Sequence, residues 1–448
     1  MPSRCKLTED VRVSRRSIRE IGSVEGNLVV NEATVKPQPG QDAVSVSGVT
    51  ECYDDCYFGS SLKTGELRGR DGRISVDGDL TAERLIKIRH GDLEVAGNLS
   101  SPKMDVGRRV SVRGDMTVDE AHVGGSLRVR GLSKATSLSV GGTFRAQSDA
   151  EVESIDVGGS VTIEGSTRGG VIDVGGTFNG EGPVEADKID VGGSVKIGSE
   201  MDVAEIDVGG TVKVAGGRSG DRIKVGGSFR ASEPLEFSLI DVGGTVRLSG
   251  GKGGDIEVGG SLRCEGDLEF EHIDVGGTVR IEGNASGRSI DVGGTARVSG
   301  DLELTETLSV GGRAEVGGGL RARRVHVGGR IEAEKVEAVE DIKTNTLLTK
   351  LGAVARSIEI GKRGEVEGPL VGETILIRDR ARVEDVHGQR VTLRRGCRAR
   401  NVYGATVVIE DGCRISGEVK YTERLEADRD VAFGVGPAKV EKLPEPPL

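Results

Sequence analysis

Residues 256–277 read IEVGGSLRCEGDLEFEHIDVGG, and this stretch decides the fold. It contains the phrase Val-Gly-Gly twice, and the same phrase recurs almost every seventeen residues through the middle of the chain. The phrase begins at Val123, Val140, Val157, Val174, Val191, Val208, Val225, Val242, Val258, Val275, Val292, Val310 and Val327. A repeat this regular indicates an array of equivalent structural units rather than one globular core.

Within one repeat the apolar residues come in pairs two positions apart. The pairs in the quoted stretch are Ile256 with Val258, Leu262 with Cys264, and Leu268 with Phe270. A spacing of two is typical of a strand with one buried face, whereas a helix needs spacings of three and four. We expect three short strands per repeat, each followed by a corner where glycine permits positive φ. The sequence therefore predicts an all-β, parallel β-helix solenoid with right-handed, triangular rungs of about 17 residues, stacked ~4.8 Å apart.

Composition excludes several classes of function. The chain has 448 residues with 72 Gly, no Trp and a net charge of -11, so nonspecific nucleic-acid binding through charge is not expected. No secretory signal stands at the start of the sequence, and no apolar stretch is long enough to span a membrane. Six Cys are too few for a disulfide scaffold. We expect a cytoplasmic protein with no transmembrane segment.

The repeat pattern divides the chain into segments. The expected segments are a flexible N-terminal tail (1–22), irregular first rungs with a Cys-containing loop (23–120), the regular Val-Gly-Gly coil (121–333), an irregular rung, short helix or hinge (334–357), C-terminal rungs (358–420) and a tail or cap (421–448). In the last segment, Val431 and Phe433 could fold back over the final rung as a removable cap.

A longer period of two repeats is also visible. The third strand of alternate repeats is apolar, as at Phe237 and Phe270, and the repeats between them are glycine-rich there. A bulky rung beside a thin one would let each Phe occupy space that glycine leaves free. Recent duplication of a two-repeat unit explains the same pattern.

Two outward positions of the coil carry charges of one sign. The first strand presents Asp156, Asp173, Asp190, Asp207, Lys224, Asp241, Glu257, Asp274 and Asp291, and the second presents Lys196, Lys213, Arg230, Arg247, Arg263, Arg280 and Arg297. Like charges stacked ~4.8 Å apart repel one another and need counterions or partners. The columns are either two solvated faces or surfaces for lateral pairing between filaments.

No constellation in the sequence predicts catalysis, a cofactor or a metal site. Cys52 and Cys56 form a Cys-x3-Cys pair, but zinc needs two further ligands and only Cys5 is near in sequence. The corners open strands and lack the Lys of a phosphate loop. We expect His90, His122, His272, His326 and His387 on the surface, and Cys264, Cys397 and Cys413 as small core residues.

The stacked repeats of about seventeen residues, with two inward apolar residues per strand, resemble the bactofilins. The resemblance covers roughly residues 74–419, and this chain is much longer than the usual member. It implies a non-enzymatic, polymer-forming cytoskeletal protein whose nucleotide-free, non-polar filaments scaffold client proteins. The resemblance also suggests contact with a membrane surface, although the start of the sequence contains no apolar targeting segment.

Two other classes of function are compatible with a coil of this kind. Hexapeptide-repeat acyltransferases also form such coils, but they carry one large aliphatic residue per hexad and a protruding loop with a catalytic His. A monomeric β-helix that serves as a binding scaffold is the other alternative. Adhesins and carbohydrate-processing β-helices call for long loops and aromatic platforms, which the sequence lacks.

Overall fold

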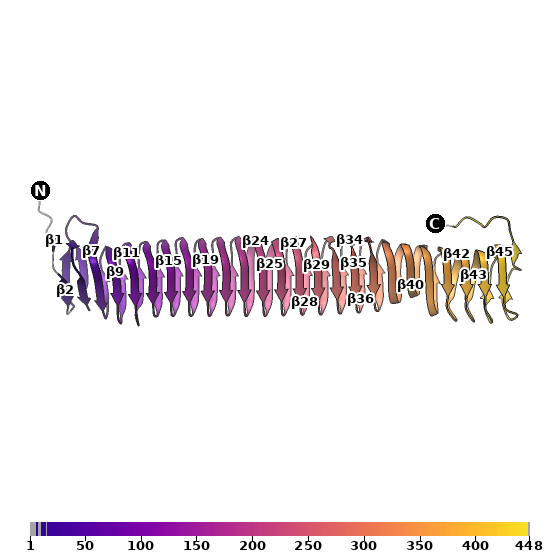
Figure 1. Cartoon of the computed structure of the whole chain (residues 1–448), viewed down its shortest axis with the longest axis horizontal. Helices are drawn as coiled ribbons and strands as arrows, with labels where there is room; N and C mark the ends of the chain where they lie inside the picture. Colours follow the sequence, from indigo (N-terminus) through magenta and orange to yellow (C-terminus); the bar gives the residue numbers. More distant parts are fainter. Residues whose placement is uncertain (1–5, 8–9, 15, 447–448) are drawn as a thin grey trace. The chain divides into compact units, whose positions relative to one another are not determined.

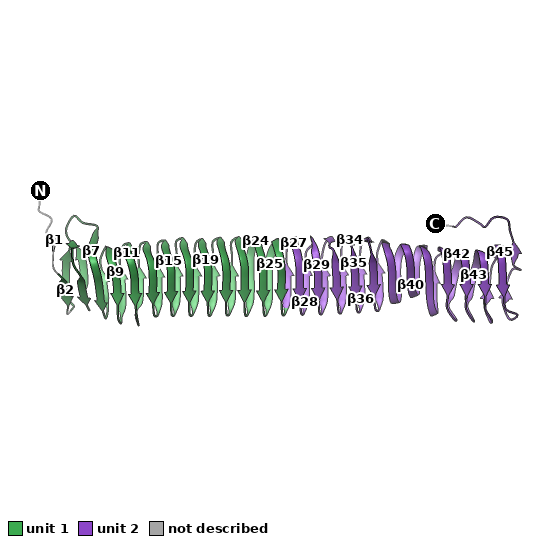
Figure 2. Cartoon of the chain, viewed as in Figure 1, with its two compact units in different colours: residues 1–227 green, residues 228–448 purple. Residues whose placement is uncertain are grey.

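The computed structural model describes residues 6–7, 10–14 and 16–446, which form two units, residues 1–227 and 228–448 (Figure 2). Every regular element of the described residues is a β-strand, and the strands pair in parallel within each unit (Figure 1). Because these residues form no helix, none of them makes a helix that could cross a membrane. The predicted all-β parallel solenoid is confirmed.

A typical rung of the first unit shows how the repeat folds. Strand β19 (Ala150–Val157) pairs with β21 (Thr167–Val174), and β20 (Ser160–Ile163) pairs with β22 (Thr177–Gly180). The pairing joins Val157 to Val174, so neighbouring rungs are offset by one repeat of seventeen residues. Here a rung has two strands rather than the expected three, because the third and first predicted strands run together as one extended strand whose pairing is interrupted between Glu151 and Ser154.

Part of the second unit keeps three separate strands in each rung. There β30 (Ser261–Cys264), β31 (Leu268–Glu269) and β32 (His272–Val275) follow one another along the chain. Each pairs with its counterpart one repeat later: β33 (Thr278–Ile281), β34 (Ala285–Gly287) and β35 (Ser289–Val292).

The core of each unit is the column of inward side chains. Ile155 and Val157 are at most 1% exposed, whereas Asp156 between them is exposed. The alternation of bulky and thin rungs is a packing device, as one of the two explanations proposed. A Cβ atom on Gly287 would collide with the ring of Phe270, and one on Gly253 would collide with the ring of Phe237.

The glycines of the Val-Gly-Gly corner serve a different purpose from the expected one. None of them has positive φ, so backbone freedom is not why glycine stands there. The corners of successive rungs stack directly on one another. The amide of Gly158 donates to the carbonyl of Val140 at 3.0 Å, and that of Gly159 donates to Gly142 at 2.9 Å. Side chains are excluded because the preceding rung's carbonyl lies too close for a Cβ atom.

Another corner carries a ladder of side-chain hydrogen bonds that the repeat analysis did not find. The amide of Asn98 donates to Asp79 Oδ1 at 2.7 Å, and the amide of Asp115 donates to Asn98 Oδ1 at 2.8 Å. Asp115 Oδ1 in turn accepts from the amide of Leu132 at 2.8 Å. Each side chain satisfies a backbone donor of the following rung, which ties successive corners together.

The described part of the expected N-terminal tail is structured. Strands β2 (Val11–Ser14) and β3 (Ile18–Ile21) pair with β5 (Leu28–Asn31) and β6 (Thr34–Pro37), so the prediction of a flexible segment is wrong for residues 11–14 and 18–21. Residues 1–5, 8–9 and 15 lie outside the described part.

The prediction of a Cys-containing loop is also wrong. This segment consists mainly of β7 (Ala43–Tyr53) and β8 (Cys56–Phe58), and both of its cysteines are buried. The polar residues between them, Asp54 and Asp55, make only a corner of the coil, with Asp54 at a φ of 56°.

The predicted segments 334–357 and 421–448 also contain strands of the coil. Residues 334–357 lie inside β40 (Gly319–Glu367), so of the three alternatives the short helix is wrong. Strand β45 (Val419–Ala427) pairs with β43 (Arg398–Ile409), and β46 (Ala432–Phe433) extends the next ladder. The proposed fold-back of Val431 and Phe433 is therefore wrong, since Phe433 stands in parallel register with Ile415.

Candidate functional site

The strand register stacks the first set of charges into an acidic column in each unit. Cα register joins Asp156, Asp173, Asp190 and Asp207 in the first unit, and Asp241, Glu257, Asp274 and Asp291 in the second. Among the described residues of the second unit, none of these four carboxylates has an ion-pair partner. Neighbouring like charges ~4.8 Å apart repel by about 0.9 kcal/mol at the dielectric constant of water. The column predicted from the sequence is confirmed within each unit.

The second set of charges forms a basic column on the strand that follows the glycine corner. In the second unit it consists of Arg230, Arg247, Arg263, Arg280 and Arg297. Arg263 and Arg280 share Glu282, at 2.9 and 3.1 Å, and Arg297 pairs with Glu315. Arg230 and Arg247 make no ion pair with any described residue. In the first unit, Lys196 and Lys213 stand in register in the same way.

The third outward column, which the sequence analysis missed, carries alternating charges. In the second unit it contains Glu236, Lys252 and Glu269 in register, and Lys252 Nζ lies 2.8 Å from Glu269 Oε2. This hydrogen bond raises the pKa of Lys252. The first unit repeats the device, with Lys134 and Glu151 at 3.2 Å. We call this the mixed column. The sequence signal for the mixed column is a charged residue whose sign alternates from one repeat to the next.

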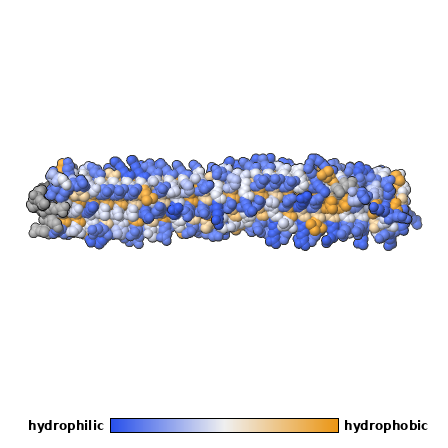
Figure 3. Space-filling model, turned by 90° about the horizontal axis from the view of Figure 1, so that it is seen from above, coloured by the Kyte–Doolittle hydropathy of each residue, from blue (hydrophilic) through white to orange (hydrophobic). Residues whose placement is uncertain are grey.

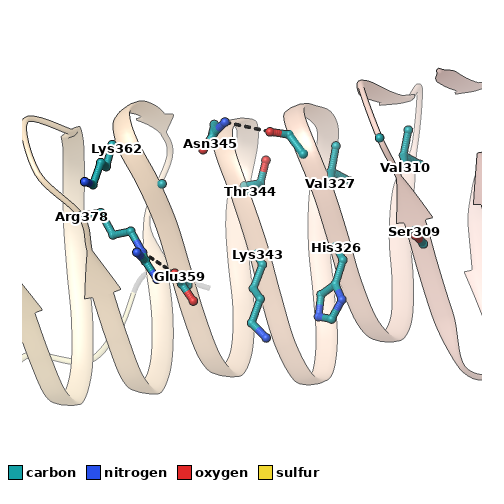
Figure 4. Close-up of a pocket in the computed structure, with 13 residues that line it drawn as sticks. Ser309, Val310, His326, Val327, Lys343, Thr344, Asn345, Glu359, Lys362 and Arg378 are labelled. Carbon is teal, nitrogen blue, oxygen red and sulfur yellow. Dashed lines mark hydrogen bonds and ion pairs between the residues drawn. The ribbon is translucent and has the colours of Figure 1, made fainter. Parts of the chain in front are cut away.

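A groove of about 690 Å³ lies over the end of the Val-Gly-Gly array in the second unit (Figure 4). It crosses several rungs and is lined by backbone of the corners and by polar side chains. The charged and imidazole groups in its lining are His326, Lys343, Glu359, Lys362 and Arg378. Figure 4 shows Arg378 and Glu359 pointing toward each other as an ion pair. The side-chain amide of Asn345 donates a hydrogen bond from Nδ2 to the backbone carbonyl of Gly328 at 2.8 Å.

The basic side chains of this groove contact carboxylates of the same unit. His326 Nε2 lies 2.5 Å from Asp341 Oδ2, and Lys343 Nζ lies 3.3 Å from the same oxygen. Burial raises the pKa of Asp341, but the hydrogen bonds from His326 and Lys343 outweigh it, so the pKa is lowered overall. Lys362 pairs with Asp379 at 3.6 Å. These contacts describe a polar, internally balanced surface groove.

A second groove, of about 540 Å³, lies in the first unit beside Cys56. Arginine side chains of three segments, Arg16, Arg73 and Arg108, line it. The hydrogen bond between Cys52 and Cys56 raises the pKa of Cys52 and lowers that of Cys56. Both thiols are buried, and the described residues hold no group of three or more potential metal ligands. Cys5 lies outside the described residues.

The remaining predicted side chains fall into two groups. Cys264, Cys397 and Cys413 are buried core residues, as expected. The prediction that all five histidines are on the surface is wrong for His387, whose ring lies 4.6 Å from that of Tyr403 and whose pKa is lowered by burial. His272 is half-buried and hydrogen-bonds Ser289 at 2.7 Å.

The visible faces of both units are mostly hydrophilic, with only narrow rows of apolar colour between the charged rows (Figure 3). The surface feature that repeats most regularly is thus the set of three charged columns. No family model, no curated protein and no solved structure matches the chain.

Proposed function

We propose that this chain is a structural protein that assembles end to end into nucleotide-independent filaments, as the resemblance to bactofilins implies. The observation that carries the proposal is the open edge of the parallel ladders. Among the described residues, β2 pairs only with β5, and β3 only with β6. A strand edge with unpaired N–H and C=O groups recruits another strand unless something covers it.

In the second unit, strand β45 also has an open edge. Strand β45 pairs along its length with β43, but its second edge pairs with β47 (Ala438–Lys439) only at Lys420 and Tyr421. Residues 422–427 are therefore available on that edge. Both open edges belong to parallel ladders, so a second copy can continue the same pairing. Such assembly needs no cofactor and no chemical step, and it would suit a cytoplasmic scaffold that positions client proteins.

The proposal is tested by removing the short strands that follow β45, of which β47 partly covers its open edge and β46 pairs with β44 (Arg414–Ile415). A chain that ends at Ala427 loses β46 and β47, which are two residues each. We expect it to form filaments at lower concentration than the full chain, measured by light scattering and negative-stain electron microscopy. If the full chain and the shortened chain both remain monomeric, the filament proposal fails and the chain is better described as a monomeric binding scaffold.

The groove around His326 favours that second candidate function. It is the largest surface groove described above and presents corner backbone together with both signs of charge. Binding of a polar ligand there would require neither assembly nor catalysis. The light-scattering experiment separates the two functions, because a binding scaffold remains monomeric under all the conditions that it tests.

A further inference from the structure

The acidic and basic columns of the second unit are matched rung by rung. Each carboxylate of the acidic column is followed, six residues later and across one corner, by an arginine of the basic column. The matched pairs are Asp241 with Arg247, Glu257 with Arg263, Asp274 with Arg280, and Asp291 with Arg297. The two columns therefore flank the glycine corner at the same heights, with opposite signs on its two sides.

The basic column becomes acidic at the same rung at which the carboxylates of the acidic column end. After Asp291 the register of the acidic column continues with Ser309 and His326. After Arg297 the register of the basic column continues with Glu315 and Glu332. A surface charged only for solubility would not need its two columns to change at one rung. Because they do, no rung from Asp241 to Glu332 carries carboxylates of these columns on both sides of the corner.

The mixed column shows that this chain can neutralise a stacked row of charges by itself. Lys252 and Glu269 do so by alternating in sign and pairing at 2.8 Å. The acidic column has no such alternation, and Asp241, Glu257, Asp274 and Asp291 have no ion-pair partner among the described residues. The repulsion within the acidic column is relieved when a surface of opposite charge and equal spacing is placed against it.

We propose that a second copy of this chain supplies that surface, so that two copies pair side by side, parallel and at the same axial height. The acidic column of each copy then lies against the basic column of the other. The inference extends the proposed function, on which it rests for the identity of the partner, because it adds lateral pairing to end-to-end growth.

Symmetry decides the orientation. The two columns flank one corner, so a two-fold axis parallel to the coil brings the acidic column of each copy against the basic column of the other, and both contacts form together. A two-fold axis perpendicular to the coil instead brings acidic against acidic.

The change from Arg297 to Glu315 in the basic column sets the axial height of the two copies. In a two-fold pair, sliding one copy along the other shifts the two contacts in opposite directions. A slide of one rung in either direction therefore places Asp291 opposite Glu315 in one of the two contacts. In the aligned arrangement no carboxylate of the acidic column faces a carboxylate of the other copy's basic column, in any rung from Asp241 to Glu332.

The test uses two full-length variants. The first carries Asp241→Arg, Glu257→Arg, Asp274→Arg and Asp291→Arg, which makes both columns basic. The second carries Arg247→Glu, Arg263→Glu, Arg280→Glu and Arg297→Glu, which makes both columns acidic. We expect each variant alone to pair laterally at least ten-fold more weakly than the natural chain. An equimolar mixture of the two should regain pairing, with both variants in each pair, as measured by sedimentation velocity at low salt.

The mixture is the decisive arm, because neither a folding defect nor a change of net charge would produce association only on mixing. Circular dichroism confirms that each variant is folded, and exchange of Lys252 and Glu269 (Lys252→Glu with Glu269→Lys) serves as the matched control, which should pair normally. About 1 M salt, at which the Debye length is about 3 Å, should dissolve lateral pairs of the natural chain.

The inference is overturned if folded variants pair as strongly as the natural chain, or if their mixture fails to pair. It is also overturned if the natural chain shows no lateral pairing at low salt. These outcomes are separable from failure of the proposed function, because filament length in 1 M salt, seen by electron microscopy, reports end-to-end assembly alone. Lateral pairs of single chains without filaments would refute end-to-end growth and retain lateral pairing.

Discussion

The carbonyl oxygen of Gly141 lies 2.6 Å from the point where a Cβ atom on Gly158 would stand. This separation is shorter than a carbon and an oxygen tolerate, and the obstacle is backbone, which cannot swing aside as a side chain can. The same relationship recurs along the Val-Gly-Gly corners, where a Cβ on Gly192 would lie 2.5 Å from the carbonyl of Gly175. Close stacking of rungs therefore explains why both corner positions are glycine.

The first prediction concerns this corner. Gly158→Ala should lower the free energy of unfolding by about 1–3 kcal/mol, because the backbone must shift to admit the methyl group. Gly220→Ala is the matched control, since a Cβ there would meet its nearest atom at 3.8 Å. Urea unfolding followed by circular dichroism measures both variants. Equal stability of the two would show that corner stacking is looser than described.

The repeat itself made the strands and the charged columns predictable. Pairs such as Ile256 and Val258 define the buried face directly, and seventeen-residue spacing then places Asp274 beside Asp291. The reason for the glycines was not predictable, because a clash between Gly141 and Gly158 depends on the distance between rungs and not on sequence neighbours.

The predictions for the irregular ends of the chain were wrong for a different reason. Residues 11–21 and 419–433 have few apolar pairs, so their periodicity is weak, yet pairing to an existing ladder supplies backbone hydrogen bonds that need no particular side chain. The burial of His387 was not predictable either. Its ring contacts Tyr403 of the next rung, in a part of the chain where the Val-Gly-Gly phrase does not mark the register.

A second prediction tests the packing of Phe270 over Gly287. Gly287→Ala should destabilise the second unit by about 1–3 kcal/mol, because the added methyl collides with the aromatic ring. Combining it with Phe270→Leu should recover part of that loss, since a smaller side chain leaves room for the methyl. A double-mutant cycle from chemical unfolding gives the coupling energy. Strict additivity of the two changes would contradict the contact.

A third prediction follows from Asp385. Hydrogen bonds from Arg400, at 2.6 and 2.9 Å, and from Asn401 lower the pKa of Asp385 below its ordinary 3.8, against the opposing effect of burial. Its contribution to stability is therefore present above pH ~4 and is lost as pH falls through the lowered pKa. Asp385→Asn should cost on the order of 1 kcal/mol near pH 7 and progressively less below pH ~4.

The control for this experiment is Asp42→Asn, which removes an exposed carboxylate without an ion pair among the described residues. Its effect on stability should be small at neutral pH. The nearby His387 also titrates, with a pKa lowered by burial, so the comparison is repeated in a His387→Gln background. A cost for Asp385→Asn that does not change between pH 7 and pH 3 would rule out the charge as its source.

The fourth prediction is that nucleotides do not affect assembly. Phosphate loops bind through free backbone N–H groups, but those of the glycine corners are already donated to the preceding rung, as Gly159 donates to Gly142 at 2.9 Å. Light scattering of the full chain should be the same with ATP, with GTP and without either. Assembly that begins only after a nucleotide is added would refute this prediction.

The alternation of Phe and Gly along the third strand fixes the length of the packing repeat in this part of the coil. Phe237 fits against Gly253, and Phe270 fits against Gly287, so the packing pattern returns after 270 − 237 = 33 residues, which is two rungs. Removing one rung would set Phe237 against Phe270, while removing two would restore the fit. The length of this part of the molecule can therefore change only in steps of about 33 residues, roughly 10 Å along the coil.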